Sequence, residues 1–320
     1  MKNIVICCDG TGNEFGRNNT NFVLTYLLAE KDERQVAYYD PGVGTGGWEY
    51  EEDGGGMRAK GDQATGRGLQ RNVEDAYRHL MRRYEPGDRV YLFGFSRGAF
   101  TVRSLAGMLH KCGLLWADAE NLVEYAGKMY NSTDVDAVAG EFRAAFAKPC
   151  PVHFIGVWDT VESLVMNAGK RFHDASLNPE VANGYHALAI DEVRRDFAPC
   201  LWDGRAIDGQ TIEQVWFAGV HADIGGWYDE RGLSNVTLHW MLEKAGSLGL
   251  RLKQDKLAEH APNPHDMAHE SYDGFWKLRG RETRRIPPRA RIHASVFERM
   301  ERSANQYHPA NLPDECQRVE

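Results

Sequence analysis

The sequence predicts an α/β protein in which a mainly parallel sheet is flanked by helices. Short apolar runs bounded by turn residues alternate with longer segments of helical periodicity, as in repeated strand, helix and strand units. Several of these runs stop at a reactive side chain. One run ends in Gly94-Phe95-Ser96-Arg97-Gly98, between an apolar stretch and a helical pattern, which is the Gly-x-Ser-x-Gly motif of a sharp strand-to-helix turn.

Length and composition are those of one folded domain. A chain of 320 residues with 42% apolar residues can fill a sizeable core, so we expect a single domain over residues 1–320. Acidic residues number 46 against 38 basic residues, for a net charge of −8. No basic stripe is dense enough to follow a phosphate backbone, which argues against a nucleic-acid partner. The six cysteines show no Cys-x-x-Cys spacing, as expected for a reducing compartment.

The first strand is expected over residues 3–8, before the turn Asp9-Gly10-Thr11. Its apolar run of five residues is too short for the core of a signal peptide or for a membrane span. We therefore expect a protein that is cytoplasmic as synthesised and has no integral membrane segment. The turn after this strand stands where ligands bind in open α/β sheets.

Alternating elements are expected between this strand and the motif. A helix over 21–30 and a strand over 35–39 precede a segment, 41–68, that is so rich in glycine that we expect a loop near the site. A helical pattern over 69–84 follows, and a Pro-Gly-Asp turn ends it before the strand of the motif.

An inserted layer is expected after the motif helix, which Gly113 ends. Two helical patterns, over 119–130 and 135–147, make up this insertion at about 114–150. We expect it to form a cap over the site. A strand over 151–158 follows and closes on an aspartate.

The last part of the chain is expected to complete the sheet and then wrap around it. The patterns predict a helix over 183–195, a strand over 212–220 and a helix over 234–245. Beyond Leu252 the chain becomes polar and dotted with prolines. We expect an irregular wrap over 253–320 rather than a second domain.

The glycines of the Gly-x-Ser-x-Gly motif have a steric reason. Side chains at Gly94 and Gly98 would collide with the neighbouring strand or helix, and the serine between them is held in a strained turn. Ser96 is thereby presented above the sheet as a nucleophile. The helix that follows directs unpaired N–H groups at it, so we expect the N–H of Arg97 to be one donor of an oxyanion hole.

Three side chains at predicted strand ends make up a catalytic set: Ser96, Asp159 and His221. If the strands are parallel neighbours, these side chains meet at one edge of the sheet. The chain order Ser, Asp, His is that of α/β-hydrolases, so the predicted fold is α/β-hydrolase-like. His221 would take the proton of Ser96, and Asp159 would hold the imidazole in one tautomer. The turn at Gly10 and Thr11 would supply the second oxyanion donor.

Other assignments stay open. Asp223, two residues after His221, competes with Asp159, which we favour because an acid so near its histidine seldom reaches behind the ring. Asp9 is expected to shape the first turn by accepting backbone N–H groups. Alternatively, Asp9, His221 and Asp223 could ligate a metal in a metal-dependent phosphoesterase. A further alternative is a non-catalytic binding protein on a hydrolase scaffold.

The favoured hypothesis needs no cofactor and no metal. His260, His265 and His269 lie among prolines without a cysteine partner, which favours a solvated loop over a metal site. The pattern as a whole therefore predicts a serine esterase or lipase that acts through an acyl-enzyme intermediate.

The chain carries four segments in order: ICCDGTGN from Ile6, GFSRGA from Gly94, GVWDTV from Gly156 and VWFAGVHADIGG from Val215. Together they resemble a bacterial domain-of-unknown-function family that includes the catalytic domain of type VI secretion phospholipase effectors. The likeness runs from the first strand to about residue 312, which is nearly the whole chain.

This resemblance implies an α/β-hydrolase whose triad falls on Ser96, Asp159 and His221. It also implies a lipid or other ester as substrate and, for an exported effector, type VI secretion with a secretion or immunity partner. Family members that attack phospholipids as toxins tend to be longer and to carry modules that help them reach a membrane. This chain shows no amphipathic or apolar segment that would serve as an anchor.

Overall fold

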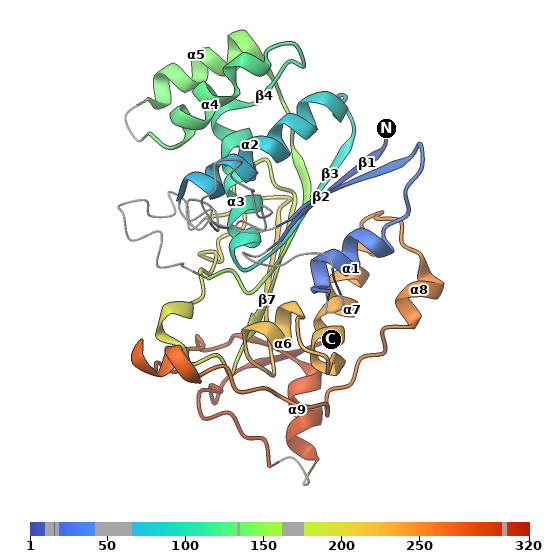
Figure 1. Ribbon diagram of the computed structural model, residues 1–320, viewed down its shortest axis with the longest axis vertical. Helices are drawn as coiled ribbons and strands as arrows, with labels where there is room; N and C mark the ends of the chain where they lie inside the picture. Colours follow the sequence, from blue (N-terminus) through green and yellow to red (C-terminus); the bar gives the residue numbers. More distant parts are fainter. Residues whose placement is uncertain (10–15, 17–18, 42–65, 133–134, 162–175, 303–305) are drawn as a thin grey trace, which may run out of the picture.

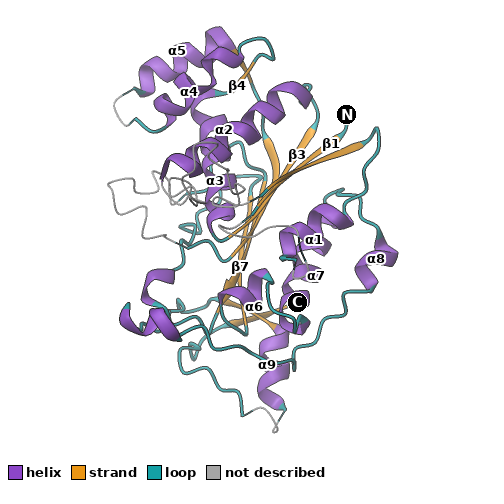
Figure 2. Cartoon of the chain, in the orientation of Figure 1, coloured by secondary structure: helices purple, strands orange, loops and turns teal. Residues whose placement is uncertain are grey.

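The structure of the protein is a computed structural model that describes residues 1–9, 16, 19–41, 66–132, 135–161, 176–302 and 306–320 (Figure 1). These residues form an eight-stranded parallel sheet with the strand order β10-β9-β8-β7-β6-β3-β1-β2. Helices cover both faces of the sheet (Figure 2). The predicted α/β fold with a mainly parallel sheet is confirmed.

The strands of the large sheet are β1 Asn3–Cys8, β2 Gln35–Asp40, β3 Arg89–Phe95, β6 Val152–Trp158, β7 Asn183–Ala189, β8 Thr211–Phe217, β9 Arg291–His293 and β10 Gln317–Val319. A separate antiparallel pair joins β4 Leu114–Leu115 to β5 Ala147–Lys148.

The α-helices are α1 Asn21–Leu28, α2 Gly66–Arg83, α3 Arg97–Cys112, α4 Val123–Tyr130, α5 Asp136–Phe146, α6 His221–Gly225, α7 Gly232–Ser247, α8 Gln254–Ala258 and α9 Ala294–Glu301. The described residues also form the short 3₁₀ helices η1 Glu120–Leu122, η3 Arg195–Phe197 and η4 Gly274–Leu278. In the described part of the chain, no helix is both long and apolar enough to cross a membrane.

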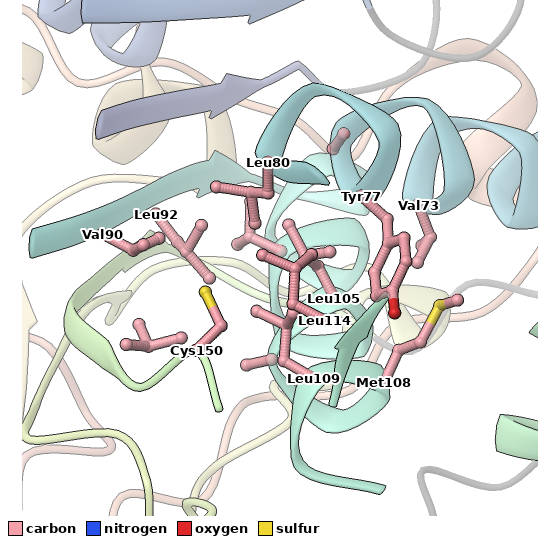
Figure 3. Close-up of a cluster of buried hydrophobic side chains, with 14 of the residues drawn as sticks. Val73, Tyr77, Leu80, Val90, Leu92, Leu105, Met108, Leu109, Leu114 and Cys150 are labelled. Atoms are coloured by element: carbon pink, nitrogen blue, oxygen red, sulfur yellow. The ribbon is translucent and has the colours of Figure 1, made fainter. Parts of the chain in front are cut away.

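Successive side chains of the central strands face opposite sides of the sheet, so the core has two layers. Ile4 and Ile6 of β1 face the layer of α2 and α3, whereas Val5 and Cys7 face the layer of α1 and α7. Figure 3 shows the first layer, where side chains of α2, α3 and β3 pack together. Because helices cover both faces, ligands have access to the sheet at the strand ends.

Most predicted elements are confirmed to within a few residues, but the prediction of a helix over 183–195 was wrong. β7 runs through the first half of this segment, between β6 and β8, and six of its seven residues are buried. A central parallel strand is buried on both faces, so its sequence lacks the polar alternation that distinguishes a strand. The run therefore resembles a helical pattern.

The segment after residue 252 contains more regular structure than the irregular wrap that we expected. It adds β9 and β10 to the edge of the sheet, and α9 packs beside them. Each of these strands is only three residues long, too short for a periodic pattern to appear in the sequence.

The helical insertion lies away from the motif serine. α4 and α5 pack on the C-terminal half of α3, where Tyr130 lies against Gly107 and Arg143 donates a hydrogen bond to the carbonyl oxygen of His110 (Figure 1). α3 is sixteen residues long, so its two ends are about 24 Å apart. The insertion is therefore at the opposite end of α3 from Ser96 and is not the cap that we expected.

Two glycines allow α3 to begin directly against the sheet. A Cβ on Gly98 would lie 2.0 Å from the carbonyl oxygen of Cys8, and one on Gly94 would lie 2.4 Å from the carbonyl oxygen of Gly98. Both obstacles are backbone atoms, which cannot move aside as a flexible side chain can. The glycines of the motif therefore determine how closely α3 approaches β3 and the end of β1.

Gly98→Ala should destabilise the protein strongly, because the added methyl group would overlap the backbone of Cys8. We expect a loss of about 3 kcal/mol in the free energy of unfolding, or a failure to fold, as measured by urea denaturation. Gly140→Ala in α5 is the control, since no atom lies within 4 Å of a Cβ there and alanine favours a helix by about 1 kcal/mol. Equal stabilities for the two variants would contradict the packing argument.

β7 also carries a buried histidine beneath the carboxyl edge of the sheet. Nε2 of His186 accepts a hydrogen bond from the N–H of Thr160, 3.1 Å away and directly after Asp159. Burial and the charge of Arg103 lower the pKa of His186 to about 3. The imidazole is therefore neutral in the folded protein and holds the turn that follows β6.

This low pKa makes folding stability depend on pH. Below about pH 6.5 the unfolded chain binds a proton at His186 that the folded protein does not, so the residue should cost about 2 kcal/mol at pH 5 relative to pH 8. The loss should continue until the pH reaches the folded pKa of about 3. His186→Gln keeps an acceptor for Thr160 but cannot titrate. Its unfolding free energy should fall less between pH 8 and pH 5, and parallel curves for the two proteins would refute the assignment.

Candidate active site

The ends of β3 and β6 bring two of the predicted site residues together. These strands pair in parallel with Phe95 opposite Trp158, so the residues that follow them are neighbours. The N–H of Ser96 donates to the carbonyl oxygen of Trp158 at 3.1 Å, and Asp159 comes next in the chain. The carboxyl edge of the sheet therefore holds Ser96 beside Asp159.

Both residues have backbone conformations that side chains rarely adopt. Ser96 has φ 55° and ψ −119°, and Asp159 has φ 41°. Strain of this kind costs on the order of 1–3 kcal/mol and persists where the surrounding structure enforces it. For Ser96 the enforcing contacts are those of Gly94 and Gly98, and α3 begins at the next residue, Arg97.

His221 reaches the same edge from the loop after β8. It is the first residue of α6, and its Nδ1 lies 2.6 Å from Oδ2 of Asp159. Its ring packs on Phe95 at a centroid distance of 4.6 Å and meets Phe197 edge-on at 4.9 Å. Because Phe95 precedes Ser96, this packing brings the imidazole to the strand end that carries the serine.

Asp159 has a partner that the sequence analysis missed. Nη1 and Nη2 of Arg284 lie 2.6 Å and 2.9 Å from its two carboxylate oxygens, and the N–H of Ala189 donates to Oδ1 at 3.0 Å. Burial by itself would raise the pKa of Asp159. The charge of Arg284 and the hydrogen bond with His221 outweigh burial and hold that pKa well below its usual range. Asp159 is therefore a buried carboxylate that is ionised at neutral pH.

Arg284 is itself held in place by backbone groups. It donates to the carbonyl oxygens of Ala189 and Phe197, at 2.9 Å and 2.7 Å. It lies in the segment that we expected to be an irregular wrap, beside an exposed arginine, Arg285. No local pattern distinguishes the two arginines, so the sequence contained no signal for this contact.

A buried glutamate holds the backbone of His221. Oε2 of Glu192 accepts the N–H of His221 at 3.2 Å, and Arg194 and Ser271 also donate to this carboxylate. Burial would raise the pKa of Glu192, but the hydrogen bonds and charge of Arg194 hold it below its usual value. Sequence reasoning missed Glu192 because it fell inside the expected helix rather than in the turn after a strand.

Asp223 contacts a different histidine. Its Oδ1 lies 2.6 Å from Nδ1 of His269, and its Oδ2 accepts the N–H groups of His269 and Val220. The ring of His269 stacks on Tyr228 at 3.6 Å. Of the two acids considered for His221, Asp159 is the one in contact with its imidazole.

The turn that we expected to supply the second oxyanion donor lies mostly outside the described residues. Asp9 follows β1 and is buried, and its N–H donates to the carbonyl oxygen of Asp40 at 3.1 Å. Gly10 and Thr11 lie outside the described residues, as does most of the glycine-rich segment. The N–H of Arg97 is at the start of α3, where backbone N–H groups have no acceptor within the helix.

The histidines near the carboxyl end of the chain make separate contacts. His265 lies 3.2 Å from a carboxylate oxygen of Glu298, and the carbonyl oxygen of His260 is 2.8 Å from Nε2 of His239. No group of three His, Cys, Asp or Glu side chains that could hold a metal ion occurs among the residues that the structure describes. Among the described residues, Asp9, His221 and Asp223 are thus not assembled into the metal site considered for a phosphoesterase.

Similarities to known proteins extend over much of the chain. An uncharacterized protein of Saccharomyces cerevisiae, YEL023C, is 34% identical in an alignment 217 residues long, which covers 61% of this chain and 32% of that protein. The crystal structure of an uncharacterized Pseudomonas aeruginosa protein covers 82% of this chain and 49% of its own, at 17% identity and a TM-score of 0.48. A Tle1 effector, solved bound to the VgrG spike of the type 6 secretion system, covers 71% and 51%, at 17% identity and a TM-score of 0.39. This chain thus spans about a third of the yeast protein and about half of each solved chain.

Residues 2–244 match the family described as type VI secretion system phospholipase effector, Tle1-like, catalytic domain. The matched region includes the motif serine, the aspartate and histidine in contact at the carboxyl edge, and all strands from β1 to β8. Because the match covers well over half of the 320 residues, this chain belongs to the family of Tle1-like phospholipase effector catalytic domains.

Proposed function

We propose that this protein is a serine hydrolase that cleaves carboxylic esters, of the lipase or phospholipase type. Ser96 would be the nucleophile, His221 the general base, and Asp159 the residue that orients the histidine. The observation that carries the proposal is the 2.6 Å contact between His221 and Asp159, next to a serine on a strained strand-to-helix turn. Membership of a phospholipase effector family supports a lipid ester as the substrate.

This arrangement suits a two-step acyl transfer. His221 contacts Asp159 through Nδ1, which leaves Nε2 to take the proton of Ser96 as its oxygen attacks the ester carbonyl. Negative charge then develops on the carbonyl oxygen near the start of α3, where the N–H of Arg97 would stabilise it. His221 returns the proton to the leaving alcohol. Water, activated by the same imidazole, then releases the acid from the acyl-enzyme.

Arg284 would act as a positioning residue in this scheme. A buried carboxylate that lost its counter-charge would take up a proton and could no longer stabilise an imidazolium. The fork of Arg284 contacts both oxygens of Asp159, which fixes the carboxyl plane so that Oδ2 faces His221. The arginine would thus keep Asp159 both ionised and oriented.

Family membership also suggests how the enzyme would be used. It would be synthesised in the cytoplasm and exported by a type VI secretion system, which requires a secretion partner. The producing cell would need an immunity partner against the same activity. Family membership alone supports these roles.

Ser96→Ala should abolish ester hydrolysis, because no other group in the proposed mechanism can form the acyl-enzyme. We expect kcat/KM for a short-chain p-nitrophenyl ester to fall by about 10³-fold or more, together with loss of labelling by a fluorophosphonate probe. Ser247→Ala, which removes an exposed serine of α7, should leave both readouts unchanged. A panel of phospholipids assayed with the same variants would then identify the natural ester.

Two outcomes would replace the proposal with one of its alternatives. Hydrolysis of a phosphate ester that survives Ser96→Ala and stops with a chelator would favour the metal-dependent phosphoesterase. Tight binding of an ester by the unmodified protein, without turnover or probe labelling, would favour a non-catalytic binding protein.

Arg284→Met should destabilise the protein by about 3 kcal/mol at neutral pH, because it leaves the carboxylate of Asp159 buried without its counter-charge. The depressed pKa of Asp159 contributes stability above the unfolded value of about 3.9, and that contribution is lost as the pH falls below it. The variant regains stability as the pH falls from 7 because its Asp159 can take up a proton, and the wild type loses stability below about pH 4, so the difference between them should shrink over this whole range. Urea unfolding over a series of pH values would measure it.

The neighbouring Arg285 provides the control for this experiment. It is exposed, so Arg285→Met should change the unfolding free energy by about 0.5 kcal/mol at most. Arg284→Lys keeps the charge but loses the bidentate fork, and should retain more stability and more activity than Arg284→Met. A stability difference between wild type and Arg284→Met that stays constant from pH 7 to pH 3 would show that the arginine acts by packing alone.

A further inference from the structure

Two large apolar side chains are exposed on η4, in the segment that returns to the candidate site. Phe275 is 64% exposed and Leu278 is 84% exposed. Most large apolar residues of the described chain are buried, and scattered exposed ones need no explanation. Phe275 and Leu278 lie on one short helical turn and form an apolar tip there. Such a tip favours contact with an apolar partner over contact with water.

A line of aromatic rings connects this tip to the histidine of the site. Trp276, between the two exposed residues, meets Phe197 edge-on at a centroid distance of 5.1 Å. Phe197 in turn meets His221 edge-on at 4.9 Å. The guanidinium of Arg194 covers the ring of Phe197 at 3.5 Å and also contacts Glu192, which holds the backbone of His221. The apolar tip is therefore two packed rings away from the imidazole.

The same turn is locally basic in an acidic protein. Residues 274–281 read Gly-Phe-Trp-Lys-Leu-Arg-Gly-Arg, with three cations between the flanking acids Asp273 and Glu282, in a chain whose net charge is −8. Lys277 and Arg281 are exposed, whereas Arg279 pairs with Asp196 at 2.8 Å. Segments that bind at a bilayer surface combine aromatic, aliphatic and cationic side chains, and this short exposed element carries all three kinds.

We propose that residues 274–281, which we call the docking turn, bind the surface of an anionic phospholipid bilayer. Phe275 and Leu278 enter the boundary between headgroups and acyl chains, while Lys277 and Arg281 contact the lipid phosphates. Docking in this way brings the carboxyl edge of the sheet, with Ser96 and His221, toward the bilayer. The benefit of this placement rests on the proposed ester hydrolysis, but the docking itself does not.

The size and chemistry of the docking turn favour a lipid surface over a protein partner. A stable protein interface buries on the order of 1,000 Å² or more, which an eight-residue segment cannot supply alone. A bilayer requires only a few apolar side chains to enter it, and anionic headgroups add attraction for nearby cations. The sequence analysis found no anchor because one 3₁₀ turn is too short to show an amphipathic period.

Vesicle co-sedimentation tests the docking apart from catalysis. The Ser96→Ala protein, which should leave lipid intact, is mixed with phosphatidylcholine vesicles that contain or lack phosphatidylglycerol. We expect it to sediment with the anionic vesicles. Adding Phe275→Ser and Leu278→Ser should lower its partition coefficient about tenfold or more, since both apolar side chains lose their burial. Adding Lys277→Gln and Arg281→Gln should lower binding to the anionic vesicles about fivefold for each charge.

The matched control removes two exposed apolar residues elsewhere. Val138 and Phe146 of α5 are 50% and 45% exposed and lie on the helical insertion, at the other end of α3 from the site. Val138→Ser with Phe146→Ser should leave vesicle binding unchanged. Thermal unfolding of each variant checks that the substitutions act at the surface and do not alter the fold.

An activity measurement links docking to substrate access. In the protein that retains Ser96, the Phe275→Ser and Leu278→Ser pair should lower hydrolysis of phosphatidylglycerol-containing vesicles about tenfold or more. It should lower hydrolysis of dissolved p-nitrophenyl acetate far less, because a dissolved ester reaches the site without a surface.

The outcomes separate the docking from the proposed function. Absence of vesicle binding, or equal loss of binding in the docking-turn and α5 variants, overturns the docking even if the enzyme hydrolyses esters. Vesicle binding that depends on the docking turn, in a protein whose hydrolysis is unaffected by Ser96→Ala, supports the docking and overturns the proposed function. The proposal is also overturned if a partner protein binds the docking turn specifically and vesicles do not bind it.

Discussion

The buried negative charge of Asp159 is the constraint on which the rest of the site depends. An ionised carboxylate without access to water must be matched by donors or counter-charges. The chain supplies them from three distant segments: His221 after β8, Ala189 at the end of β7, and Arg284 after η4. Satisfying one charge therefore fixes the positions of three segments relative to β6. The orientation of the His221 imidazole is one result of that arrangement.

Local sequence was sufficient for the features that depend on neighbours along the chain. Gly94 and Gly98 are four residues apart, and the contact that excludes a side chain at Gly94 is with the backbone of Gly98. The strained turn at Ser96 could be predicted because the motif itself contains the cause of the strain. β1, β3 and β6 were likewise predicted, because each is an apolar run bounded by turn residues on both sides.

The features that sequence analysis missed depend on contacts between distant segments. β7 lacks the polar alternation of a half-buried strand, and it is a strand because β6 and β8 lie on either side of it. Arg284 differs from the exposed Arg285 only in what the folded chain places next to it. The helical insertion was predicted, but its position on α3 depends on packing such as that of Tyr130 against Gly107. None of these contacts leaves a periodic or spacing signal.

The segment beyond the family match completes the site that the matched region begins. Residues 2–244 contain Ser96, Asp159 and His221, but Ser271 and Arg284, which hold Glu192 and Asp159, come later in the chain. The same later segment carries η4, whose Trp276 packs against the ring that supports His221. Through the ring of Phe197, η4 is in packed contact with the imidazole of His221. The part of the chain that balances the charge of the site is thus also the part through which a surface contact would reach it.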